Sequence, residues 1–299
     1  NPKNNLVPIY IANQIHNDSH HSATVDWPGS GVDYNGRTTY SFKKDYIHSL
    51  PASVRLNEAL AHYNSDLINL IMVYLDDIDL MAHLLGPETL EVKQKLKEVD
   101  ALLGPFLTTV LSNGQTDVMI VSDHGFRTLE AGKKISSHDL FKDLEVNVIG
   151  DGAIVSLYPN EFNGLEDLHK KSEILAVELT KIEQPDKYKV YLKEDLPTYL
   201  HYSDSDRIPP IVIIMKNGYY YYKKERKRQG DHGWSVQTDT KMRAIFIAIG
   251  PSFYSGKTIE CLHMTDIYMI ACHVLKIQDS CHPNNGNPQI LRKMIKSYK

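Results

Sequence analysis

A strand–helix–strand pattern between residues 71 and 121 constrains the fold of this chain more than any other feature. Residues 71–75, Ile-Met-Val-Tyr-Leu, form a short apolar run that indicates a buried strand. Between residues 92 and 110, apolar residues recur at spacings of three and four with charged residues between them, which indicates an amphipathic helix. Residues 118–121 predict a second strand. Two strands joined by a helix favour a parallel sheet covered on both faces, and hence an α/β fold.

The rest of the sequence is compatible with one α/β domain over residues 1–299. Hydrophobic residues make up 42% and charged residues 23% of the chain, as in a globular protein with a sizeable core. In residues 211–224, Asn-Gly separates an apolar run from an aromatic run, which predicts a β-hairpin within a small antiparallel insertion near residues 185–230. Further strands are expected at residues 153–157, 189–192 and 243–249, and helices at residues 165–182 and 265–275.

Charge and cysteine content limit the classes of partner and compartment. The net charge of −4 gives no reason to expect a nucleic-acid partner. The apolar runs are too short to span a bilayer, but the chain starts at Asn1, so we expect a fragment whose parent could carry a membrane anchor. Cys261, Cys272 and Cys281 are compatible with one local disulfide or with three thiols. The tripeptide at residues 17–19, Asn-Asp-Ser, is a glycosylation sequon.

Side chains of metal-binding type follow two of the predicted strands. Ligands collect at the carboxyl ends of parallel strands, and Asp79 and His83 are spaced to lie on one helical turn after the first strand. Asp123 and His124 follow the second strand directly, and the glycine after them frees the backbone so that both side chains can converge. His232, next to a glycine, is a third candidate. Each motif alone has a structural alternative, such as Asp123 capping a turn, whereas their order favours a metal site.

The order of these motifs resembles that of the nucleotide pyrophosphatase/phosphodiesterase family, within the alkaline-phosphatase superfamily. It is similar in particular to the branch that acts on NAD and dinucleoside polyphosphates. The resemblance implies an alkaline-phosphatase-like, three-layer α/β/α fold with a mostly parallel central sheet and a small antiparallel insertion. The segments that carry the resemblance are residues 8–10, 27–30, 77–87, 122–126, 190–195, 207–210, 230–234 and 283–286.

The chemistry implied by the resemblance is hydrolysis with two zinc ions. The substrates would be nucleotides or dinucleotides, cleaved at phosphodiester or pyrophosphate bonds to release nucleoside 5′-monophosphates. One zinc would be bound by Asp79, His83 and His232, and the other by Asp123 and His124 plus residues outside this chain. Two metal ions can clamp the attacking and leaving oxygens of a phosphoryl transfer. The family is secreted or held at the cell surface, which implies an extracellular, membrane-associated glycoprotein.

Part of the family's catalytic machinery would lie upstream of this chain. In the family, a threonine attacks phosphorus and forms a covalent phospho-enzyme. That threonine, a zinc-binding aspartate and an asparagine precede the first segment matched here, and no threonine of this chain occupies the same context. We therefore expect a catalytic domain that lacks its nucleophile-bearing N-terminal segment. The chain by itself is expected to be inactive or nearly so, whereas its parent is expected to be an enzyme.

Three aromatic residues are candidates for nucleoside binding. By resemblance, Tyr46 is placed to stack on a base, and Trp27 and Tyr74 lie near the same pocket. A flat ring can stack on any base, so the selectivity for the base would be loose. All three are also compatible with places in the core or at its rim. Two further functions stay open: hydrolysis of choline phosphodiesters or lysophospholipids, and a truncated extracellular domain that binds a metal or a partner without turnover.

Overall fold

The structure, a computed structural model, describes residues 7–17, 19–39, 50–65, 67–141, 144–223 and 227–296. The chain divides into two compact units that alternate along the sequence. Unit 1 comprises residues 1–79, 94–123 and 246–299, and unit 2 comprises residues 80–93 and 124–245. The single catalytic domain expected over residues 1–299 stays a prediction.

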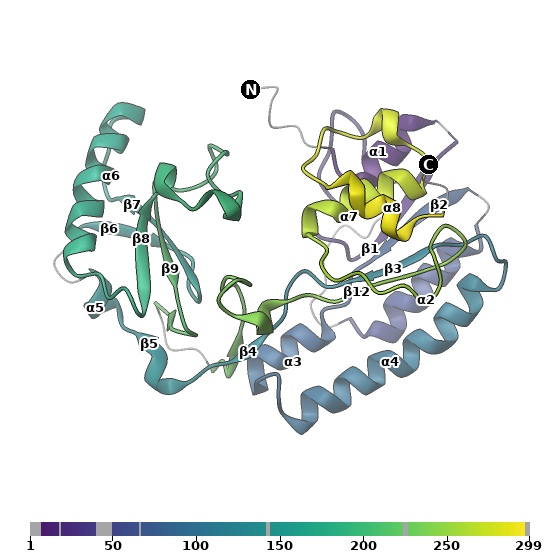
Figure 1. Cartoon of the computed structure of the whole chain (residues 1–299), viewed down its shortest axis with the longest axis horizontal. Helices are drawn as coiled ribbons and strands as arrows, with labels where there is room; N and C mark the ends of the chain where they lie inside the picture. Colours follow the sequence, from purple (N-terminus) through teal and green to yellow (C-terminus); the bar gives the residue numbers. More distant parts are fainter. Residues whose placement is uncertain are drawn as a thin grey trace. The chain divides into compact units, whose positions relative to one another are not determined.

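Unit 1 contains two short sheets and the helices around them (Figure 1). In one sheet β1 pairs in parallel with β2, and in the other β3 pairs antiparallel with β12. Helices α3 and α4 both begin in one unit and end in the other. The elements are α1 (Ile9–His16), β1 (His21–Val25), α2 (Ala52–Tyr63), β2 (Ile68–Val73), α3 (Asp77–Leu85), α4 (Leu90–Leu111), β3 (Val118–Val121), β12 (Phe246–Ile249), α7 (Met264–Val274), η6 (Gln278–Ser280) and α8 (Pro288–Met294).

The elements of the strand–helix–strand prediction are confirmed, but their pairing differs. Strand β3 lies at the predicted residues, α4 extends slightly beyond the predicted 92–110, and β2 spans residues 68–73 rather than the predicted 71–75. Within the described residues, however, β2 pairs with β1 and β3 pairs with β12, so the parallel pair is β1–β2. The strand predicted at residues 243–249 begins only at Phe246. Strands β2, β3 and β12 are half-buried or exposed rather than buried, whereas β1 is almost entirely buried.

The C-terminal helices of unit 1 pack on the second sheet. Ile270 of α7 and Leu291 of α8 are buried and belong to one apolar cluster, against which Met119 of β3 and Phe246 of β12 pack. A disulfide joins Cys272 to Cys281, and Cys261 is exposed and free. The pattern is therefore one local bridge with a leftover thiol, one of the arrangements that the sequence left open.

A buried ion group lies where β1 and β2 end. The Arg55 side chain of α2 is fully buried, with its Nε 2.8 Å from Asp26 Oδ2 and its Nη1 paired with Asp76. The same Nη1 lies 3.5 Å from Oδ2 of Asp77, the first residue of α3. A single arginine thus ties α2 to the ends of both strands and to the start of the helix that carries the first metal motif.

Unit 2 is built on a four-stranded antiparallel sheet with the order β6-β7-β9-β8, on which α6 packs (Figure 1). The sheet spans residues 146–215, so the antiparallel region begins earlier than the predicted 185–230. The predicted strands and helix at residues 153–192 are confirmed with small shifts of their ends. The elements are β4 (Arg127–Thr128), η2 (Ala131–Lys133), β5 (Lys134–Ile135), α5 (Ser137–Phe141), β6 (Val146–Ile149), β7 (Ile154–Pro159), α6 (Gly164–Lys181), β8 (Tyr188–Leu192), η3 (Lys193–Asp195), η4 (Thr198–Leu200), β9 (Ile211–Met215), β10 (Tyr220–Tyr221), β11 (Gly230–Asp231) and η5 (Thr240–Met242).

The predicted hairpin over residues 211–224 is wrong, although its turn forms. Asn217 and Gly218 both have positive φ, 52° and 76°, as a two-residue turn requires. Strand β9, however, already pairs with β7 on one edge and β8 on the other, which leaves no edge for a hairpin partner. The chain therefore leaves the sheet after the turn, and β10 pairs in parallel with β5.

Candidate metal centre

Helix α3 carries Asp79 and His83 four residues apart, at the spacing that places both side chains on one helical face. After the helix the chain turns at Gly86, whose φ is +90°. The carbonyl of His83 accepts a hydrogen bond from the Gln229 backbone N–H at 2.8 Å. This bond ties the end of α3 to the segment that leads to His232.

Close backbone packing brings His232 to α3. Strand β11 pairs antiparallel with β4 and passes beside the end of the helix. A Cβ at Gly230 would lie 2.4 Å from the carbonyl oxygen of Ala82, so only glycine fits this approach. As a result, Nε2 of His232 lies 3.2 Å from Nε2 of His83.

The separation of these two nitrogens suits two ligands of one ion. Nitrogen ligands lie about 2.0–2.1 Å from a tetrahedral zinc, so two of them on one ion lie about 3.3 Å apart. Asp79 adds a carboxylate from α3, and the ligand atoms of the three residues lie within 4.8 Å of one another. In the described part of the chain, Asp79, His83 and His232 are the one group of three such side chains. Mixed nitrogen and oxygen donors fit zinc.

The ring of His83 has a polar neighbour on the side away from His232. Its Nδ1 lies 3.0 Å from the Gly230 carbonyl oxygen and 3.2 Å from Nη1 of Arg228. A carbonyl only accepts and a guanidinium only donates, so Nδ1 cannot satisfy both. We assign the proton to Nδ1, so that it donates to Gly230, because that contact is the shorter of the two. Nε2 is left with its lone pair toward His232, the orientation that a metal-binding histidine needs.

Aromatic rings surround the two histidines. The His124 ring stacks on His232 with centroids 3.4 Å apart and planes 9° from parallel. Phe126 meets His83 and His232 edge-on, at centroid distances of 4.8 Å and 5.3 Å. The three imidazoles predicted as ligands therefore gather in one place within unit 2, and His124 contacts His232 through its face.

The glycine after His124 serves a different purpose from the one expected. The φ of Gly125 is not in the left-handed region, so backbone freedom is not what requires glycine there. A Cβ at this position would lie 1.9 Å from the Lys241 carbonyl oxygen, so close approach is the reason. The boundary between the two units falls between Asp123 and His124. A second zinc site built on these two residues stays a prediction.

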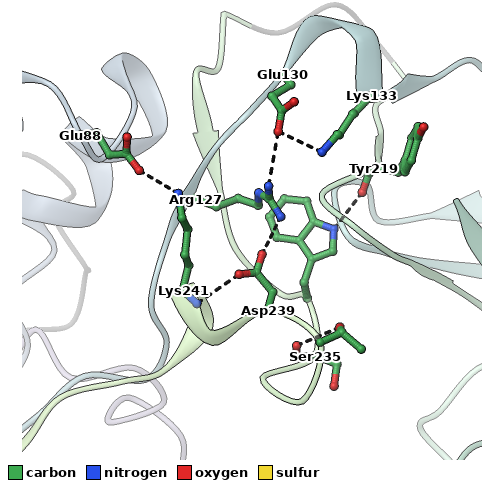
Figure 2. A network of polar contacts seen from close by, with 10 residues as sticks. Glu88, Arg127, Glu130, Lys133, Tyr219, Ser235, Asp239 and Lys241 are labelled. Carbon is green, nitrogen blue, oxygen red and sulfur yellow. Dashed lines mark hydrogen bonds and ion pairs between the residues drawn. The ribbon is translucent and has the colours of Figure 1, made fainter. Parts of the chain in front are cut away.

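Within unit 2, ion pairs join the segment that follows His124 to the segment that follows His232 (Figure 2). Arg127 follows the His124 loop, and its Nη1 lies 2.7 Å from Asp239 in the segment after His232. The guanidinium carbon lies 5.7 Å from the centroid of the Trp234 ring, and Figure 2 shows the guanidinium between Asp239 and Glu130. These contacts hold the chain segments on both sides of the stacked rings.

The acidic and aromatic candidates of unit 1 lie near one another. The rings of Trp27 and Tyr74 meet edge-on, with centroids 6.5 Å apart. Burial raises the pKa of the Tyr74 hydroxyl, and the carboxylates of Asp123 and Asp79 raise it further. Tyr74 is therefore within electrostatic reach of two of the predicted metal ligands. Tyr46 lies outside the described residues.

Three residues next to the histidines were not singled out from the sequence. Asp231 is buried, Tyr222 donates to it at 2.5 Å, and Arg228 lies beside both Asp231 and His83. Asp231 lies within residues 230–234, one of the segments that carry the family resemblance, and Tyr222 lies within the aromatic run that was assigned to a hairpin. Their involvement could not be read from spacing, because it depends on where β10 goes after the turn.

Comparison with known proteins finds one family along most of the chain. The family described as type I phosphodiesterase / nucleotide pyrophosphatase matches residues 4–235. Ectonucleotide pyrophosphatase/phosphodiesterase family member 7 of Mus musculus is 28% identical over 316 residues, covering 98% of this chain and 67% of that protein. Bis(5'-adenosyl)-triphosphatase ENPP4 of Homo sapiens is 28% identical over 290 residues, covering 95% of this chain and 60% of that protein.

Solved structures agree with this result. Human ectonucleotide pyrophosphatase/phosphodiesterase 5 superposes with a TM-score of 0.84 at 26% identity, covering 97% of this chain and 75% of that one. An inactive form of the murine protein in complex with AMP gives a TM-score of 0.82 at 25% identity, covering 96% and 75%. The likeness confirms the predicted alkaline-phosphatase-like α/β fold. Among the described residues, no helix is both long and apolar enough to cross a membrane.

Proposed function

Because this chain belongs to the type I phosphodiesterase / nucleotide pyrophosphatase family, we propose that its parent protein is a zinc-dependent hydrolase of extracellular nucleotides. It cleaves phosphodiester or pyrophosphate bonds and releases nucleoside 5′-monophosphates. The observation that carries the proposal is the group of Asp79, His83 and His232, whose ligand atoms lie within 4.8 Å of one another. The chain spans 67% and 60% of the two relatives compared, so the activity is proposed for the whole protein.

The residues of this chain would hold and orient the metal. Asp79, His83 and His232 bind one zinc, and Asp123 and His124 contribute to a second together with residues outside the chain. Bound zinc supplies a Lewis acid that neutralises charge on the phosphoryl group. The hydrogen bond from His83 Nδ1 to the Gly230 carbonyl keeps Nε2 available as a ligand. The close approach at Gly230 keeps His232 facing that nitrogen.

Nucleotides are the proposed substrate class because aromatic rings accompany the acidic residues. Trp27 and Tyr74 form an edge-to-face pair, and the Tyr74 hydroxyl is within electrostatic reach of Asp79 and Asp123. A base stacked on such rings would bring its attached phosphate toward the metal ligands. We include Tyr46 in this role by family resemblance. One relative is called a bis(5'-adenosyl)-triphosphatase and another was solved with AMP, which supports the same class.

Removal of the metal from the whole protein is expected to abolish hydrolysis of a nitrophenyl ester of thymidine monophosphate. The reason is that the proposed site has carboxylate and imidazole donors whose role is to hold that metal. Elemental analysis should find two zinc ions per protein, and added zinc should restore turnover after chelation. This chain alone, assayed alongside, should bind zinc but show little turnover.

Three outcomes would contradict the proposal. A well-folded whole protein that binds no zinc and hydrolyses no nucleotide would show that the protein is not the proposed zinc-dependent hydrolase. Hydrolysis of choline phosphodiesters or lysophospholipids without hydrolysis of nucleotides would place the substrate in the lipid class. Zinc binding without turnover of either class would indicate a binding domain.

Passage of the protein through the secretory pathway is expected to attach a glycan at Asn17. Asn17 and Ser19 are exposed, and the amide oxygen of Asn17 accepts hydrogen bonds from the backbone N–H and the hydroxyl of Ser19, both at 2.9 Å. A surface sequon of this kind is a substrate for N-glycosylation. Digestion with a glycosidase should lower the mass of protein secreted from animal cells, and the Asn17→Gln and Ser19→Ala variants should lack the shift at this site. Secreted protein in which Asn17 carries no glycan would contradict this prediction.

A further inference from the structure

A buried tyrosine–aspartate pair lies behind the two histidines of unit 2. Tyr222 and Asp231 are each only 5% exposed. The Tyr222 hydroxyl donates to Asp231 Oδ2 at 2.5 Å. The other oxygen, Oδ1, accepts the backbone N–H of His232 at 3.0 Å and lies 3.7 Å from Nδ1 of His83. One carboxylate therefore faces the tyrosine with one oxygen and both histidines with the other.

The carboxylate also offsets a positive charge. Nη1 of Arg228 lies 3.5 Å from Asp231 Oδ1 and 3.2 Å from His83 Nδ1, so the guanidinium stands beside an imidazole that must remain neutral to bind a metal. The anion of Asp231 keeps Arg228 in an ion pair at this place. The Asp231 carboxylate thus offsets the positive charge of Arg228 beside His83 Nδ1, the nitrogen that lies 3.0 Å from the Gly230 carbonyl oxygen.

The tyrosine–aspartate pair requires a glycine at position 152. Gly152 has φ +86°, and a Cβ there would lie 2.9 Å from Asp231 Oδ2. The backbones of Gly152 and Tyr221 are hydrogen-bonded to each other: each N–H group donates to the other residue's carbonyl, at 2.6 Å and 3.0 Å. The strand bridge therefore fixes the residue before Tyr222, and with it the position of the hydroxyl.

We propose that Tyr222 and Asp231 are positioning residues that hold His83 and His232 in the geometry that binds the metal. This inference rests on the proposed function, because it concerns the same metal. Neither residue belongs to the proposed ligand group of Asp79, His83 and His232. Tyr222 orients the Asp231 carboxylate, and Asp231 fixes the backbone of His232 and the surroundings of His83 Nδ1. Partners behind metal-binding histidines commonly change metal affinity by about 10–100-fold when removed.

A purely structural role is the alternative, and Tyr188 provides the matched control. Tyr188 is also fully buried in unit 2, and its hydroxyl donates to the Ile182 carbonyl at 2.7 Å. It belongs to strand β8, where it packs in the sheet core rather than against the histidines. Tyr222→Phe and Tyr188→Phe thus each delete one buried tyrosine hydroxyl that donates a hydrogen bond.

The experiment measures metal affinity and needs no turnover. Zinc is titrated into the metal-free whole protein against a competing chelator, and cobalt(II) is titrated while its visible absorption is recorded. Tyr222→Phe is expected to weaken zinc binding by about 10–100-fold and to alter the cobalt spectrum. Tyr188→Phe should bind both metals as the unmodified protein does. Thermal unfolding of the two metal-free variants should show comparable decreases in midpoint.

Asp231→Asn serves as a second variant that keeps the shape of the side chain and removes its charge. Its metal affinity should fall at least as far as that of Tyr222→Phe. Equal affinity in Tyr222→Phe, Tyr188→Phe and the unmodified protein would overturn the inference while leaving the metal site itself in place. Absence of zinc binding in the unmodified whole protein would instead overturn the proposed function, and the positioning role with it.

Discussion

In the whole protein, replacing His83 with alanine is expected to weaken zinc binding by more than about 100-fold, beyond the effect of losing a partner behind a ligand. Activity should fall by about 1,000-fold or more, because a metal contributes several kcal/mol to charge stabilisation and about 1.4 kcal/mol is a factor of ten. The physical reason is that His83 faces His232 at 3.2 Å and shares the group with Asp79. Chelator competition and kcat/KM for a nitrophenyl nucleotide ester measure the two effects.

The control for this variant is His169→Ala. His169 lies on α6 of the same unit, its side chain is 61% exposed, and its neighbours are Glu173 and Glu194. Metal affinity and turnover should be unchanged in this variant. If His83→Ala instead kept both at the level of the control, with cooperative unfolding in each protein, the three-residue group would not be the metal site.

Replacing Arg55 with alanine is expected to lower the free energy of unfolding by about 3–5 kcal/mol, the cost of leaving buried charges without their partner. The side chains of Asp26 and Asp76 are 0% and 4% exposed, so water cannot replace the guanidinium. The substitution also removes the 3.5 Å contact to Asp77 at the start of α3. Urea denaturation of the variant and the unmodified protein gives the difference directly.

A matched control tests the explanation for Arg55. Lys95→Ala, in the same unit, removes an ion pair of 2.7 Å whose side chains are 31% and 48% exposed, and it should change the stability far less. A deficit no larger than that of Lys95→Ala would show that the buried group does not hold these strands together.

Local patterns predicted several of the individual elements. The three- and four-residue spacing defined α4, the short apolar runs defined β2 and β3, and the i,i+4 spacing placed Asp79 and His83 on one face of a helix. These features depend on residues close together in the chain, so the sequence states them directly. The family motifs also identified His232 as a partner of α3, which local spacing could not do.

Pairing between distant strands could not be predicted in the same way. The Asn217-Gly218 turn forms as expected, yet β9 has both edges occupied by β7 and β8, and β10 joins β5. Which strands compete for an edge depends on the whole unit, and no window of sequence contains that information. The same holds for the glycine at position 125. Its conformational freedom does not explain why glycine is needed there. The reason is that a Cβ would lie 1.9 Å from the carbonyl oxygen of Lys241, a residue distant in the sequence.

The sequence by itself predicted helices α4, α6 and α7, the order of the motifs and the chemical types of the proposed metal ligands. Only the tertiary structure decided what stands behind those ligands. Tyr222 contacts Asp231 because the chain leaves the four-stranded sheet after the turn that follows β9. Asp231 lies near His83 because Gly230 allows β11 to approach α3. The physical reason is that hydrogen bonds and ion pairs act over a few ångströms. Contacts between residues 148 positions apart, such as His83 and Asp231, exist only once the chain is packed.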